Sequence, residues 1–152
     1  MSIQSGPNYD RNRFPKAQAK GLCRGCGNPV PARRESWCSN ACFERYDPAR
    51  VRFACRQRDQ GVCAECGVDT ESLRRSVLPE PCGGGWSPAL PNREERLAEL
   101  AAQGWPNTAR RRWWEMDHIT PFSEGGLTVL ENVRTLCVPC HKRRTKDWRL
   151  SL

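Results

Sequence analysis

The cysteines constrain this chain more than any other feature, because eight of its ten cysteines stand in close pairs. The pairs are Cys23/Cys26, Cys38/Cys42, Cys63/Cys66 and Cys137/Cys140. Two residues between two thiolates let one tight turn aim both sulfurs at a metal about 2.3 Å away. The pairs therefore predict two structural zinc sites, one formed by the first two pairs and one by the last two.

Disulfide bonds are the alternative use of paired cysteines, and they require an oxidising compartment. The opening segment, Met1 to Pro7, has no apolar stretch of the kind that directs secretion. We therefore expect an intracellular location, in the cytoplasm or nucleoid, where thiols stay reduced and available for zinc. Of the two remaining cysteines, we expect Cys55 to be a buried thiol and Cys82 an exposed loop thiol.

The composition explains why metal would be needed for stability. The 152 residues are 38% hydrophobic and include 12 glycines and 12 prolines, so one large apolar core is not expected. No apolar run reaches the roughly 18 residues that a membrane span needs. The 25 basic residues exceed the 17 acidic ones, giving a net charge of +8. This excess favours an anionic partner.

Three regions are predicted along the chain. Residues 1–20 form a flexible basic arm, since Arg11 to Arg34 holds seven basic residues and no acid. Residues 21–48 form an N-terminal zinc module, which we interpret as a DNA-binding finger, a protein-docking module or a structural extension. Residues 49–152 form a second domain with an insertion over 68–112.

Local signals predict several helices. Ser39 is a plausible N-cap for a helix that reaches Tyr46 and stops at Asp47-Pro48. A second helix is expected from Ala49 to Gln60, and a third from Asn92, as a possible cap, to Gln103. Pro79 to Pro91 is too rich in proline and glycine for regular structure.

The C-terminal third predicts a strand, a loop, a strand and a helix. The strands are expected over 113–119 and within 127–136, with Pro121 and the Gly125-Gly126 pair forcing the loop between them. A helix should follow from Val138 to about Arg149. We expect Trp105, Trp113 and Trp114 to be core or lid aromatics rather than base-stacking platforms.

This block also contains the only two histidines of the chain, His118 and His141. Asp117 on the first strand and His141 at the start of the helix can converge on one divalent cation. Strand alternation directs His118 to the other face, where a neutral imidazole can take a proton from water. Asn132 can hold the loop or fix the tautomer of His118. A zinc ion at Cys63, Cys66, Cys137 and Cys140 would fix the helix start that presents His141, because Cys140 directly precedes it.

The Asp117-His118 pair, Asn132, His141, the Pro121-x-Ser123-x-Gly125-Gly126 loop and the paired knuckles resemble the HNH endonuclease family. The likeness spans roughly 62–147 and is specific over 115–145. It implies a small α+β, zinc-stabilised fold with a ββα-metal core, an N-terminal four-cysteine zinc module and a partly helical insertion. It further implies His118 as general base, Asp117 and His141 as ligands of Mg²⁺ or a similar cation, and Asn132 as a positioning residue.

Two departures from that pattern stand out. The spacing from Cys66 to Asp117 is far longer than in minimal family members, which leaves the role of the insertion open. Some relatives carry a third metal-binding histidine one helical turn after the second, where this chain has Thr145. Two protein ligands would then hold the catalytic cation.

The implied reaction is metal-dependent hydrolysis of DNA phosphodiester bonds, which leaves 5′-phosphate ends. The expected partner is DNA, and no membrane partner is expected. A monomer fits the sequence, which leaves the oligomeric state open. The residues expected to grip backbone phosphates are Lys142, Arg143, Arg144 and Lys146. The alternative reading is a non-catalytic, zinc-stabilised DNA-binding or adaptor protein.

Overall fold

A computed structural model describes residues 21–77, 91–106 and 112–151. The predicted basic arm over 1–20, Cys82 and nearly all of the irregular segment over 79–91 lie outside these residues. The chain divides into two compact units. One consists of Met1–Arg58 with His118–Arg134, and the other of Asp59–Asp117 with Thr135–Leu152.

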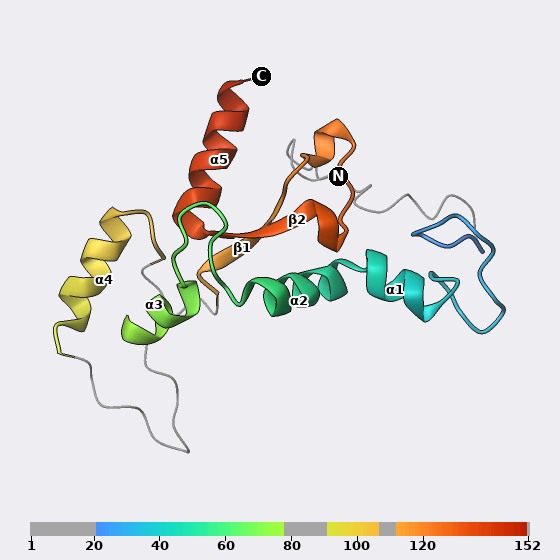
Figure 1. Cartoon of the computed structure of the whole chain (residues 1–152), viewed down its shortest axis with the longest axis horizontal. Coiled ribbons are helices and arrows are strands. Elements are labelled where there is room, and N and C mark those ends of the chain that lie inside the picture. The colour runs from blue at the N-terminus through green and yellow to red at the C-terminus, as the bar shows by residue number, and fades with distance from the viewer. Residues whose placement is uncertain (1–20, 78–90, 107–111, 152) are drawn as a thin grey trace, which may run out of the picture. The chain divides into compact units, whose positions relative to one another are not determined.

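The C-terminal part is a β-hairpin followed by a helix, as predicted (Figure 1). Strand β1 spans Trp114–His118, strand β2 spans Val133–Cys137, and the two form a two-stranded sheet. Helix α5, Val138–Leu150, follows β2 directly and has a proline in its first turn, where a missing N–H costs nothing. The predicted small α+β class with a ββα core is confirmed.

The loop between the strands contains two short 3₁₀ helices, η1 over Phe122–Glu124 and η2 over Leu130–Asn132. Gly125 ends η1 in the left-handed conformation, with a φ of 85°. Glycine adopts this conformation without steric cost. The glycine pair therefore turns the chain where the sequence predicted a loop.

Two consecutive helices precede the first knuckle of the second cysteine cluster. Helix α1 spans Asn40–Tyr46, and Ser39 caps it as predicted by accepting a hydrogen bond from the Cys42 backbone N–H at 3.1 Å. Helix α2 spans Pro48–Asp59. Asp47 ends α1 and also caps α2, because its Oδ1 accepts the backbone N–H groups of Ala49 and Arg50.

The described part of the insertion contains two helices, of which the sequence predicted one. Helix α3, Thr70–Val77, was not predicted, whereas α4, Arg93–Ala102, lies within the predicted range. The prediction of Asn92 as a capping side chain was wrong. Asn92 precedes α4, but its φ of 57° is left-handed and its side chain makes no capping hydrogen bond. A capping side chain requires an extended backbone at that position.

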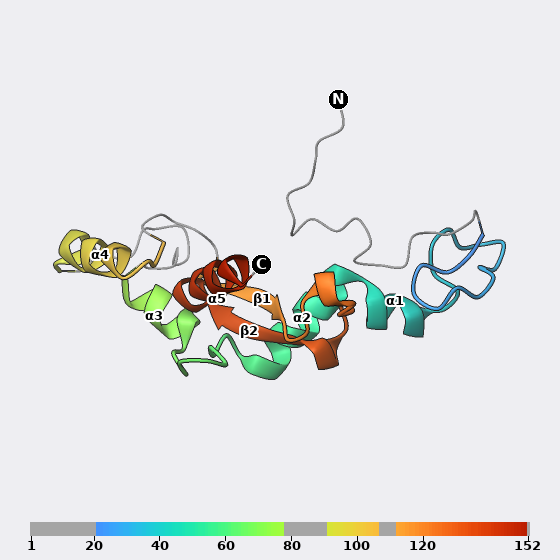
Figure 2. The same ribbon diagram turned by 90° about the horizontal axis from the view of Figure 1, so that it is seen from above.

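Helices α3 and α4 contact each other, and they lie side by side in both ribbon views (Figures 1 and 2). Val77, Leu100 and Trp113 form a buried cluster there, with Trp105 packed against it. Trp113 and Trp114 are 0% and 2% exposed, which confirms that they are core aromatics. The described part of the insertion therefore supplies apolar packing beside the first strand.

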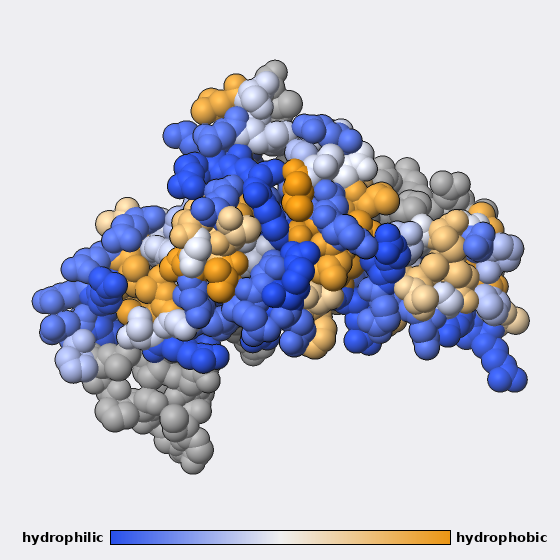
Figure 3. Space-filling model, viewed as in Figure 1, coloured by the Kyte–Doolittle hydropathy of each residue, from blue (hydrophilic) through white to orange (hydrophobic). Residues whose placement is uncertain are grey.

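Apolar residues on the drawn face form separate patches among hydrophilic side chains (Figure 3). Two clusters of buried residues in the described part of the chain are small, one around Leu136 and the other around Leu100. Cys55 on α2 is 0% exposed, which confirms the predicted buried thiol. No helix in the described segments is long and apolar enough to cross a membrane.

Candidate active site and metal centres

The second cysteine cluster joins the segment that precedes the insertion to the ββα element. Its four sulfurs, from Cys63, Cys66, Cys137 and Cys140, lie within 4.8 Å of one another. The sulfurs of Cys66 and Cys137 are 3.7 Å apart. Tetrahedral coordination with Zn–S bonds near 2.3 Å separates the sulfurs by about 3.8 Å. The arrangement fits a closed zinc site.

Backbone hydrogen bonds build this site around its first knuckle. The Gly67 N–H donates to the Cys63 carbonyl at 2.9 Å and closes the turn. The Ala64 N–H donates to the Thr135 carbonyl of β2 at 2.8 Å. Buried Leu136 and partly buried Val68 pack against the sulfurs. The knuckle is thus attached to the strand that supplies Cys137.

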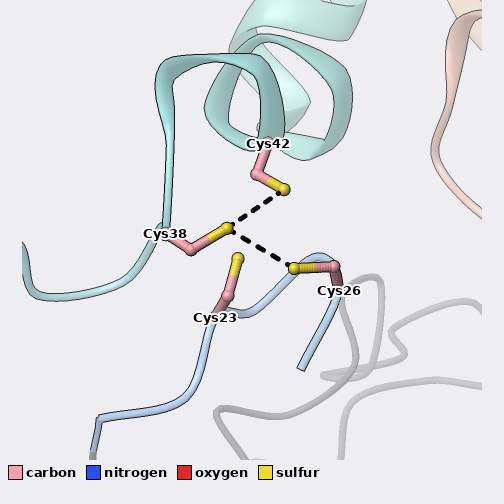
Figure 4. Close-up of side chains that lie close together, drawn as sticks. All are labelled: Cys23, Cys26, Cys38 and Cys42. Atoms are coloured by element: carbon pink, nitrogen blue, oxygen red, sulfur yellow. Dashed lines mark hydrogen bonds between the residues drawn. The ribbon is translucent and has the colours of Figure 1, made fainter. Parts of the chain in front are cut away.

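The first cluster brings Cys23, Cys26, Cys38 and Cys42 together in the same way (Figure 4). The Cys38 sulfur lies 3.5 Å from the Cys26 sulfur and 3.5 Å from the Cys42 sulfur. Cys42 comes from α1, whereas the other three come from the segment before it. Both predicted four-cysteine groupings are therefore present.

Each cluster contains a thiol whose surroundings favour the thiolate. Burial opposes ionisation of Cys63, but backbone N–H groups of Cys137, Cys66 and Glu65 outweigh it and lower its pKa to about 7. In the first cluster burial again opposes ionisation, yet backbone N–H groups lower the pKa of Cys23 to about 6. Backbone amides directed at a sulfur stabilise its negative charge, as a zinc ligand requires.

Asp117 lies on β1 and makes an ion pair with a residue of α5. Its Oδ2 is 3.2 Å from Nε of Arg144, and the two side chains are 12% and 31% exposed. The carboxylate therefore reaches the helix that carries His141. His141 is half-buried and lies near the start of that helix, directly after Cys140. Among the described residues, Asp117 and His141 do not belong to a group of three or more ligating side chains.

Thr145 lies one helical turn after His141 on α5. Its hydroxyl donates to the backbone carbonyl of His141, at 2.9 Å. Serine and threonine hydroxyls within helices commonly bond the carbonyl four residues earlier. The hydroxyl is thereby directed to the helix backbone.

His118 ends β1, and its imidazole is held by two neighbours. Nε2 lies 2.8 Å from Oγ1 of Thr128, which is 1% exposed. The ring of Phe122 meets the imidazole edge-on, with 6.4 Å between centroids. A buried hydroxyl at this distance fixes the orientation of the ring. The sequence did not indicate Thr128, because no local pattern relates residues ten apart across an irregular loop.

Asn132 ties the loop between the strands together. Its Oδ1 accepts the Thr120 N–H at 2.9 Å, and its Nδ2 donates to the carbonyls of Thr120 and Leu127 at 3.2 and 2.9 Å. Its own carbonyl accepts the Ile119 N–H at 2.8 Å. Of the two roles considered for Asn132, these contacts match that of holding the loop.

Gly126 is buried beside this asparagine. A Cβ atom added at Gly126 would collide with the carbonyl of Thr120 and would lie 2.8 Å from Nδ2 of Asn132. Real Cβ atoms do not approach other atoms so closely. The second glycine of the pair is therefore required by close packing rather than by a left-handed backbone.

The basic residues at the start of α5 have intramolecular partners. Arg143 lies 3.2 Å from Glu65 and 3.3 Å from the Cys140 sulfur, and Arg144 pairs with Asp117. The Lys142 ammonium donates to the Gly104 carbonyl at 3.3 Å. Lys146 is exposed. The sequence predicted that these residues contact backbone phosphates, and it gave no sign of the intramolecular contacts, which join residues distant in sequence.

Comparison with known proteins adds to this geometry. Residues 105–147 match the HNH endonuclease family. A mouse protein named DNA annealing helicase and endonuclease ZRANB3 is 28% identical over 95% of this chain and 15% of its own length. The human protein of that name is 29% identical over 82% of this chain and 13% of its own length. The chain thus spans a small fraction of these relatives. No solved structure matches it significantly.

Proposed function

We propose that the chain, whose residues 105–147 match the HNH endonuclease family, hydrolyses DNA phosphodiester bonds with a divalent cation. One observation carries the proposal. Asp117 on β1 reaches α5, the helix that begins beside the cysteine cluster and presents His141. The family match covers this ββα element.

Asp117 and His141 are the side chains that would hold the cation. A carboxylate and a neutral imidazole suit Mg²⁺, Mn²⁺ or a similar ion, and two protein ligands leave positions for water and phosphate. When bound, the cation stabilises negative charge on the phosphate and on the departing 3′ oxygen. The ion pair with Arg144 supports an ionised Asp117, which this role requires.

His118 would act as the general base that takes a proton from the attacking water. The ordinary pKa of an imidazole, near 6.5, makes this exchange efficient at neutral pH. Thr128 fixes the ring, and Asn132 fixes the backbone that follows it. The product would carry a 5′-phosphate.

The two cysteine clusters would each hold a structural zinc ion. Four sulfur ligands close the coordination sphere and leave no position for substrate. The cluster of Cys63, Cys66, Cys137 and Cys140 would anchor the start of α5, and the other would hold the N-terminal module together. Structural and catalytic metals are therefore assigned to different residues.

DNA would be gripped through its phosphates by Lys142, Arg143, Arg144 and Lys146 at the start of α5. Such contacts give affinity without sequence preference. When DNA and the cation bind, Arg144 would leave its ion pair with Asp117 and pair with a phosphate instead. Binding should therefore weaken steeply as salt rises.

A plasmid-nicking assay with Mg²⁺ or Mn²⁺ tests the proposal. Wild-type protein should nick supercoiled DNA and leave 5′-phosphate ends, whereas His118→Ala should cut about 10²–10⁴-fold more slowly while binding DNA equally well. Branched DNA should be included among the substrates. Equal inertness of both proteins with every metal would refute endonuclease activity.

The ion pair of Arg144 with Asp117 favours a second candidate, a non-catalytic zinc-stabilised DNA-binding or adaptor protein. An arginine on the proposed metal ligand is a stable arrangement without a cation. In that case Arg144→Gln should not increase Mn²⁺ binding, and wild-type protein should bind DNA without cutting it. Increased Mn²⁺ binding by Arg144→Gln supports the endonuclease.

A further inference from the structure

We propose that Arg58 is a positioning residue of the active site. Arg58 holds the backbone on both sides of Asn132 and, through Asn132, the backbone next to His118. The inference rests on the proposed function, in which His118 is the general base. Arg58, Asn132 and His118 all belong to the same compact unit.

Arg58 lies in the last turn of α2 and bonds two carbonyls that are far away in sequence. Its Nη1 donates to the Leu130 carbonyl at 2.8 Å, and its Nη2 donates to the Val133 carbonyl at 2.7 Å. These carbonyls flank Asn132, which ends η2. A planar guanidinium holds two acceptors in fixed relative positions.

Arg58 has a different effect on each of the two carbonyls. Val133 is 0% exposed, so its carbonyl is shielded from water and requires a donor within the protein. The Leu130 carbonyl already accepts the Val133 N–H, which closes the 3₁₀ turn. Arg58 therefore reinforces a turn and satisfies a buried acceptor at once.

Asn132 transmits this constraint to the strand that ends in His118. Its carbonyl bonds the Ile119 N–H, and its side-chain Oδ1 bonds the Thr120 N–H. Ile119 and Thr120 directly follow the histidine in the chain. A shift of the segment between Leu130 and Val133 would move these two acceptors and the backbone of the proposed base with them.

The hydrogen bonds of Arg58 with the two carbonyls also depend on the shape of its side chain. The Arg58 Nη2 lies 3.8 Å from the buried Cys55 sulfur, one helical turn earlier, which helps to orient the guanidinium. A lysine carries a single ammonium group on a flexible stem and lacks the rigid fork. Arg58→Lys should therefore retain only part of the effect.

The test compares Arg58→Ala and Arg58→Lys with Arg56→Ala, a control at an exposed arginine of the same helix. We expect kcat for plasmid cleavage to fall tenfold or more in Arg58→Ala, with KM within twofold of wild type and Arg58→Lys between the two. Amide hydrogen exchange at Ile119 and Thr120 should become at least tenfold faster in Arg58→Ala. Arg56→Ala should match wild type in kcat and in exchange.

Two results would overturn the proposal: wild-type kcat in Arg58→Ala, or a reduced kcat with unchanged exchange at Ile119 and Thr120. If Arg58→Ala loses its zinc or fails to fold, Arg58→Lys decides the question by the same two measurements. Inert wild-type protein would refute the proposed function alone, because the exchange rates still show whether Arg58 holds this backbone.

Discussion

Single side chains around the loop between β1 and β2 fix how the proposed base is presented. His118 is held by a buried hydroxyl, Asn132 bonds three backbone groups, and Gly126 leaves no space for a side chain. The carboxylate of Asp117 makes an ion pair with Arg144. These contacts involve few atoms, so single substitutions should separate their roles.

Gly126→Ala should disrupt the loop although it adds one methyl group. The new Cβ would displace the Thr120 carbonyl and the Asn132 amide, at a cost of about 1–3 kcal/mol in unfolding free energy. Urea denaturation measures that cost, and the nicking assay should show a reduced rate. Glu124→Ala, an exposed position in the same loop, is the matched control. Wild-type stability of Gly126→Ala would contradict the close packing described here.

Residue types and spacing were sufficient to predict the two four-cysteine clusters, but not the partners of the polar side chains. Both groupings of cysteines follow from spacing alone, because a tight turn fixes the distance within each pair. The pairing of Arg144 with Asp117 and of Thr128 with His118 depends on where separate segments pack. A sequence read locally contains no signal for such contacts.

Among the secondary-structure elements, prediction succeeded where a strong start or stop signal was present. Ser39 and Asp47-Pro48 marked α1, and the glycine pair marked the loop between the strands. Helix α3 was missed, although its signal was available. Asp69 precedes α3, and its Oδ1 accepts the backbone N–H groups of Glu71 and Ser72 at 3.0 and 2.9 Å. Asp69 is therefore the N-cap of α3.

Asp69→Ala should therefore lower the free energy of unfolding by about 1 kcal/mol, whereas Asp69→Asn should change it by only a few tenths. Hydrogen bonds from Ser72 are the main reason that the pKa of Asp69 lies below its ordinary value of 3.8. A lowered pKa means that the ionised form stabilises the fold above the ordinary pKa, and that this contribution is lost as pH falls through the folded value.

Urea denaturation at pH 5 and pH 8 measures the contribution of the ionised Asp69 cap. Because both conditions lie well above the pKa of Asp69, the difference between wild type and Asp69→Ala should be the same at each. A difference that disappears at pH 5 would contradict the assignment of Asp69 as an ionised cap.

For the molecule as a whole, we expect zinc at the two cysteine clusters to supply much of the stability. One small cluster of buried residues in the described part of the chain includes Cys63, Cys137 and Cys140. A structural zinc site of this kind contributes on the order of 10 kcal/mol of folding free energy. Metal binding should therefore decide whether the ββα element folds.

Cys137→Ser should reduce the zinc content from two ions per chain to one and unfold the C-terminal element. Cys55→Ser is the control, because Cys55 is equally buried but belongs to neither cluster. Mass spectrometry under native conditions counts the zinc, and circular dichroism follows the melting. Cys137→Ser protein that melts at the wild-type temperature would show that the site is dispensable.

We propose that Asp117 and His141 hold an exchangeable cation separate from both cysteine sites. Electron paramagnetic resonance of Mn²⁺ added to zinc-loaded protein tests it most directly, with Asp117→Asn and His141→Ala as variants. The wild type should bind one Mn²⁺ and both variants should lose it, while all three proteins keep two zinc ions. Absence of Mn²⁺ binding by the wild type, or undiminished binding by either variant, would contradict the claim.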